Sequence, residues 1–89
     1  MKAIVTVVGK DKVGIIAGVC ACLASYNVNV LDISQTVMQG YFTMMMIVDV
    51  SACTLPLSQL CLIMEETGQE KGLSIRLQRE DIFEAMHRI

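Results

Sequence analysis

Two segments of this chain, residues 2–8 and 41–50, are apolar at nearly every position. A surface strand alternates between apolar and polar residues, so a run that is apolar on both faces predicts a strand inside a sheet. The segment at 73–79 instead carries leucine or isoleucine at 73, 75 and 77, with polar residues between them. That alternation is typical of an edge strand with one solvated face.

Helical patterns separate these strands. Residues 14–26 carry apolar side chains at the spacing of a helix with one buried stripe. A second helix is predicted over 55–71, with Thr54 as its cap and Pro56 in its first turn. Gly72 follows the last periodic residue and predicts the end of that helix.

A hairpin is predicted around Gln39-Gly40, because glycine supplies the positive φ that a tight turn demands. The hairpin joins the central segment 41–50 to a preceding strand at 28–38. Strict alternation along that strand places Val30 and Asp32 on the same side of the sheet.

The order is therefore β-α-β-β-α-β, followed by a short helix at 81–89. We predict an α+β fold of the ferredoxin-like type, a sandwich with a four-stranded antiparallel sheet, two helices on one face, and a short C-terminal helix. With 89 residues the chain forms one domain over 1–89, of which 2–80 is the core unit.

Two predicted surfaces lack a cover. The second face of the sheet carries apolar side chains, and the helix at 14–26 has alanines instead of charges opposite its core stripe. Exposed apolar patches of several hundred Å² are a liability, so the tail helix, a second subunit or both should cover them. We expect a homo-oligomer, in the simplest case a dimer.

Binding rather than catalysis is indicated by the run Gly-Lys-Asp-Lys-Val-Gly at 9–14, which joins the first strand to the first helix. A helix N-terminus has unpaired backbone N–H groups and the positive end of the helix dipole, so it attracts a carboxylate or a phosphate. The chain has no cluster of catalytic side chains, so no catalytic residue, cofactor or metal site is predicted.

Composition excludes further classes of function. The net charge is −2 with no basic block, which argues against nucleic acid and against an anionic membrane surface. The uncharged stretch 13–31 is interrupted by glycine, serine and asparagine, so no membrane span is expected. The alternation of a strand divides Met44, Met45 and Met46 between two faces, which favours packing over soft-metal binding.

The four cysteines, Cys20, Cys22, Cys53 and Cys61, are interpreted as small apolar thiols. No export signal precedes them, so a reducing, cytoplasmic location is expected.

The run Val-Val-Gly-Lys-Asp-Lys-Val-Gly-Ile-Ile-Ala-Gly, followed by Asn-Val-Asn-Val-Leu-Asp-Ile-Ser-Gln, resembles the ACT domain. The resemblance extends from residue 2 to about residue 80. Many ACT domains have proline where Val13 stands. The tail resembles that of stand-alone ACT proteins of bacteria and archaea, which are similar to the ACT half of the glycine-cleavage-system repressor group.

This resemblance implies a regulatory module that binds an amino acid at a subunit interface. Carried over residue by residue, the ligand-binding positions would be the loop residues Asp11, Val13, Gly14 and Ile15 and the strand residues Asn29 and Val30. Backbone amides near Gly14 would hold the carboxylate, and Asp11 and Asn29 would hold the ammonium or a polar group.

Simpler roles remain open for three of these residues. Asp11 could cap the helix, Gly14 could serve close packing, and Asn29 could bond its own turn. The alternative for the whole chain is a ligand-free protein-interaction or oligomerisation module of the same fold.

Overall fold

The computed structural model describes residues 1–10 and 14–81. Its elements are β1 (Lys2–Lys10), α1 (Ile15–Ser25), β2 (Asn29–Met38), β3 (Tyr41–Asp49), α2 (Leu57–Lys71) and β4 (Ser74–Arg79). This is the predicted β-α-β-β-α-β order, and the predicted ferredoxin-like fold is confirmed. The helix predicted at 81–89 lies, apart from Asp81, outside the described residues.

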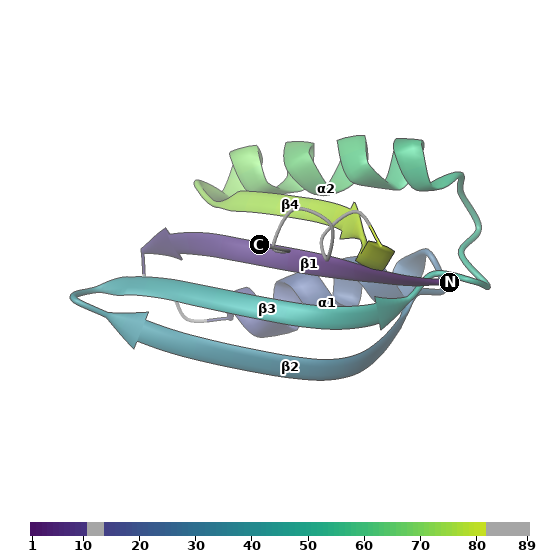
Figure 1. Ribbon diagram of the computed structural model, residues 1–89. Helices are drawn as coiled ribbons and strands as arrows, with labels where there is room; N and C mark the ends of the chain where they lie inside the picture. The colour runs from purple at the N-terminus through teal and green to yellow at the C-terminus, as the bar shows by residue number, and fades with distance from the viewer. Residues whose placement is uncertain (11–13, 82–89) are drawn as a thin grey trace.

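The sheet has the strand order β2-β3-β1-β4, and all its pairings are antiparallel (Figure 1). The two strands that are apolar on both faces, β1 and β3, lie in the middle as predicted, and β4 lies at an edge. The hairpin between β2 and β3 turns on Gln39 and Gly40, with φ of 49° and 84°. Two successive positive φ values are those of a type I′ turn, whose twist matches that of the flanking strands.

One face of the sheet forms the core together with both helices. The buried cluster includes Val5 and Val7 of β1, Met44, Met46 and Val48 of β3, Val19 and Leu23 of α1, and Leu60 and Met64 of α2. Met45, between the two buried methionines, is 40% exposed on the other face, so the predicted division of the methionines is confirmed. No polar or charged residue is buried among those described.

The opposite face of the sheet keeps exposed apolar side chains. Val8 is 40% and Tyr41 is 55% exposed, and their pairing partners Thr43 and Lys10 share this face. The predicted cover for this face is the tail helix or a second subunit.

Two local predictions were wrong. A bulge between Val30 and Asp32 leaves Leu31 as an extra residue, so Val30 pairs with buried Val48 while Asp32 pairs with Ile47 on the opposite face. Val30 and Asp32 therefore do not share a side. Thr54 does not cap α2: that helix follows Pro56 without a side-chain cap, and the Thr54 N–H donates to the Tyr26 carbonyl (3.1 Å) at the end of α1.

Asp49 at the end of β3 gives the fold an acid-sensitive contact. Its carboxylate accepts the Ser51 N–H (2.9 Å) and lies 3.6 Å from the N-terminal amine. Hydrogen bonds from Ser51 and, to a lesser extent, the N-terminal charge hold the pKa of Asp49 below its usual value. The charged form is thus favoured by folding.

We therefore expect a pH-dependent effect for Asp49→Asn. A carboxylate with a lowered folded-state pKa stabilises the protein above its unfolded pKa of about 4, and that contribution disappears as the pH falls through the folded pKa. Urea unfolding at pH 6 should find the variant slightly less stable than the parent, and the difference should shrink below about pH 4. A difference that stays constant from pH 6 to pH 2 would contradict this assignment.

Candidate functional site

The loop side of the predicted site centres on Gly14, which precedes α1. Gly14 has a φ of 84°, in the left-handed region, and no side chain among residues 1–10 and 14–81 caps the helix that follows. A Cβ added at this position would meet nothing within 4 Å. Gly14 thus packs closely against no residue of the described ranges, and its positive φ is what requires glycine at this position.

A hollow of about 540 Å³ adjoins Gly14. It is lined by Gly14 and Ile15 at the start of α1 and by residues at the end of α2, among them Lys71 and Gly72. The Lys71 ammonium lies over α1, 3.6 Å from the point where a Cβ on Gly18 would stand. The hollow therefore brings the positive end of the α1 dipole and the Lys71 ammonium together with the Glu70 side chain and the C-terminal end of α2, so groups of both charges face it.

The strand side of the predicted site lies at the other end of the molecule. At one end of the sheet, Asp49 pairs with both Asn29 and Lys2. At the other end, Tyr41 pairs with both Met38 and Lys10. Gly14 follows the Lys10 end, so a strand of about 9 residues, roughly 30 Å, separates it from Asn29. Within one chain, the loop side at Gly14 and the strand side at Asn29 therefore do not lie close to each other.

The remaining predicted residues divide in the same way. Ile15 adjoins Gly14, but its side chain is 7% exposed and belongs to the core, so only its backbone faces the hollow. Val30 follows Asn29 and packs half-buried against the core. Asp11 and Val13 lie outside the described residues.

An uncharged surface borders both halves. On α1, Ala17, Ala21 and Ala24 are exposed, as the absence of charge from this helix led us to expect. On the same face of the sheet, the adjacent edge strand β2 leaves Ile33 39% and Val37 57% exposed. We call these five residues the α1–β2 surface. α1 begins at the Gly14 end of the molecule and β2 begins at the Asn29 end, so the two elements that carry these residues run between the two ends.

Sequence reasoning missed Lys71 as a neighbour of Gly14. The signal was available in the topology: β1 ends and β4 begins at the same end of the sheet, since Val8 pairs with Ser74. The start of α1 and the end of α2 must therefore meet there. Lys71, which directly precedes the predicted helix end at Gly72, could therefore have been placed beside the loop at 9–14.

Other chemistry has little support in the described part of the chain. Over residues 1–10 and 14–81, no three His, Cys, Asp or Glu side chains are grouped as metal ligands. All four cysteines are free and half-buried. No helix in the same ranges is long and apolar enough to cross a membrane.

A four-stranded antiparallel sheet covered by two helices occurs in proteins of many functions, so the fold alone does not assign one to this chain. The chain belongs to the ACT domain family, whose family model matches residues 2–78. ACT domains are regulatory modules that bind small molecules.

Relatives of equal length are found in bacteria and archaea. A UPF0237 protein of Clostridium acetobutylicum is 52% identical over 89 residues, which cover 100% of both chains. A UPF0237 protein of Pyrobaculum aerophilum is 47% identical over 87 residues, covering 98% of this chain and 97% of the relative. These matches confirm the resemblance to stand-alone ACT proteins.

Solved structures agree with this assignment. An ACT domain protein from Streptococcus pneumoniae superposes with a TM-score of 0.83 at 48% identity, over 94% of each chain. A protein described as a glycine cleavage system transcriptional repressor gives a TM-score of 0.72 at 20% identity, over 86% of this chain and 44% of that chain. At that identity, the second match concerns the fold alone.

Proposed function

We propose that this protein is a non-enzymatic regulatory module that binds an amino acid between two copies of the chain. The observation that carries the proposal is the position of Gly14 and Asn29 at opposite ends of the α1–β2 surface. In a two-fold dimer with antiparallel edge strands, the start of one β2 lies beside the end of the other. Pairing through this surface therefore brings Asn29 of each copy toward Gly14 of its partner.

The chemistry of the two halves suits a zwitterion. The backbone N–H groups at the start of α1 and the Lys71 ammonium favour the carboxylate of the ligand. The side-chain oxygen of the partner's Asn29 can accept a hydrogen bond from the ligand ammonium. Asp11 and Val13 complete the loop side in this proposal, and Ile15 and Val30 contribute backbone groups and apolar contact.

Regulation follows from the composite site. A ligand that touches both copies binds the dimer more tightly than the monomer, so it shifts the assembly or its affinity for a partner protein. Couplings of this kind are worth about 1–3 kcal/mol. The four free thiols fit a reducing compartment, and we place the protein in the cytoplasm.

Calorimetry and thermal-shift measurements with each of the common amino acids test the proposal directly. A bound ligand raises the unfolding temperature of the native oligomer by mass action. If the native oligomer binds none of them, the amino-acid part fails and the second candidate, a ligand-free oligomerisation or protein-interaction module, takes its place. That candidate is supported by the α1–β2 surface, which needs a cover with or without a ligand.

Mixing two defective variants should restore binding. Lys71→Glu places a negative charge in the hollow, and Asn29→Ala removes the amide from the strand side, so each homodimer should lose affinity. In a mixed dimer, one site carries both defects and the other carries neither. After unfolding and refolding the two variants together, calorimetry should recover about a quarter of the parental sites. A site confined to one chain would show no recovery.

A further inference from the structure

The edge of the sheet at β4 has backbone groups that face away from the rest of the fold. Among residues 1–10 and 14–81, β4 pairs with β1 alone. Two hydrogen bonds establish which of its groups point outward. The Leu73 N–H donates to the Gly68 carbonyl (2.7 Å), and the Cys61 thiol donates to the Leu77 carbonyl (3.2 Å). In an antiparallel strand, every second residue points its N–H and C=O to the same side. Ile75 lies midway between Leu73 and Leu77, so its N–H and C=O also point away from β1.

Of the described residues, those of α2 cover both ends of this edge and leave its middle open. Gly68 closes one end and Cys61 the other. Burial, and next the charge of Glu65, raise the pKa of the Cys61 thiol, which keeps it a protonated donor. Between them lies a hollow of about 500 Å³ whose lining includes Glu65, Gln69, Ile75, Arg76 and Leu77. Among residues 1–10 and 14–81, no backbone hydrogen bond outside the strand pairings involves Ile75.

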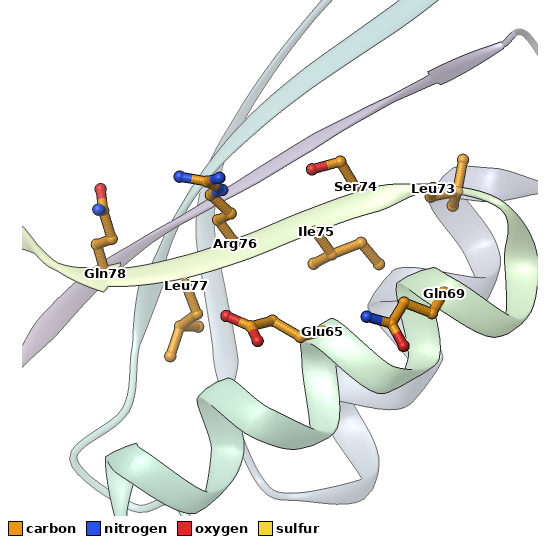
Figure 2. Close-up of a pocket in the computed structure, with 8 residues that line it drawn as sticks. All are labelled: Glu65, Gln69, Leu73, Ser74, Ile75, Arg76, Leu77 and Gln78. Carbon is orange, nitrogen blue, oxygen red and sulfur yellow. The ribbon is translucent and has the colours of Figure 1, made fainter.

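The two sides of the hollow carry opposite charge. Figure 2 shows Glu65 and Gln69 reaching from α2 toward Ile75 and Leu77, while Arg76 points to the other side of β4. Both Glu65 and Arg76 are exposed, and neither forms an ion pair within residues 1–10 and 14–81. Glu66 and Glu70 add further exposed acidic groups to α2.

We propose that the β4 edge binds an extended basic peptide segment of a partner protein by strand addition. The peptide backbone would pair with the N–H and C=O of Ile75 and with the N–H of Leu77, as exposed strand edges pair with other chains. Alternate side chains of an added strand point to opposite faces. A lysine or arginine on the helix side would meet Glu65, and a polar or acidic residue on the other side would meet Arg76.

A second copy of this chain suits the same edge poorly. Two-fold pairing of two β4 edges would place two α2 helices side by side, each with Glu65, Glu66 and Glu70. Like charges in such an arrangement repel, and repulsion of this kind is a common means of excluding wrong partners. Charge complementarity therefore favours a basic segment from another protein.

The test uses a soluble decapeptide of alternating threonine and lysine, titrated into the ¹⁵N-labelled full chain and followed by NMR. Saturable shifts of the Ile75 and Leu77 amide signals are expected. Glu65→Lys should weaken binding about tenfold or more, and should favour the matching threonine–glutamate peptide instead. Glu66→Lys makes the same charge change on the same helix outside the hollow, and should leave the affinity within about threefold.

Three outcomes would overturn the proposal. One is the absence of saturable shifts at Ile75 and Leu77. Another is an equal loss of affinity in the Glu65→Lys and Glu66→Lys variants, which would mean attraction to an acidic helix without strand pairing. The third is self-association that Glu65→Lys alters in sedimentation experiments, because a second copy would then occupy the edge. The amino-acid site at Gly14 is tested separately by the mixed-dimer experiment.

Discussion

Replacing Ala21 with glutamate should convert the proposed dimer into monomers. Ala21 is exposed in the middle of the uncharged face of α1, and glutamate is a good helix former, so the chain itself should still fold. In the proposed dimer the new carboxylate would be buried without a partner, twice per two-fold interface. An uncompensated buried charge costs about 3–5 kcal/mol, so even one of the two would raise the dimer Kd by a factor of about 100 to 1,000 or more.

Sedimentation equilibrium of the parent and the variant measures this change. Leu62→Glu is the matched control: Leu62 lies on α2, away from the α1–β2 surface, and is 59% exposed. It introduces the same charge and should leave the dimer Kd unchanged. If both variants dimerise like the parent, the α1–β2 surface is not the interface, and the exposed sheet face around Val8 and Tyr41 becomes the surface to test. Amino-acid affinity should fall together with dimerisation in Ala21→Glu.

The second large effect is expected at Gly68, where α2 approaches β4 closely. A Cβ added to Gly68 would stand 2.9 Å from the Leu73 carbonyl oxygen and 3.0 Å from Ile75 Cγ1. The oxygen belongs to the backbone and cannot swing aside, so the helix must move away from the strand. Overpacking of this kind costs about 1–3 kcal/mol. Gly68→Ala should therefore lower the free energy of unfolding, although alanine has the higher helix propensity.

Gly18→Ala provides the matched control for Gly68→Ala, because the same change is made inside the other helix. A Cβ at Gly18 would meet only the end of the Lys71 side chain, at 3.6 Å. Without a clash, the helix propensity of alanine should stabilise the protein by about 0.5–1 kcal/mol. Urea unfolding at one fixed protein concentration compares the two variants. Equal effects of the same sign would refute the role assigned to Gly68.

The element order followed from local patterns and was predicted nearly completely. Apolar runs identified β1 and β3 as central strands, and the polar side of 73–79 identified β4 as an edge. Gln39-Gly40 identified the hairpin. These features depend on side-chain periodicity and on turn conformations that neighbouring residues decide among themselves.

Errors arose where a distant segment decides the local structure. The bulge at Leu31 is a feature of the register between two strands: Val30 pairs with Val48, and Asp32 already pairs with Ile47. No pattern within β2 alone reveals this register. Thr54 resembles a helix cap, but its backbone bonds to Tyr26, a residue 28 positions earlier in the chain. Local signals of this kind are overridden when tertiary contacts satisfy the same backbone group.

The sequence by itself determined which elements form, which strands are central, and which family the chain resembles, because hydrophobic periodicity and turn residues act over short distances. Only the tertiary structure decided where the site residues lie. It placed Gly14 beside Lys71 and separated Gly14 from Asn29 by the length of a strand. The physical reason is that strand pairing and helix packing set distances between residues far apart in the chain, and such distances leave no periodic trace in the sequence.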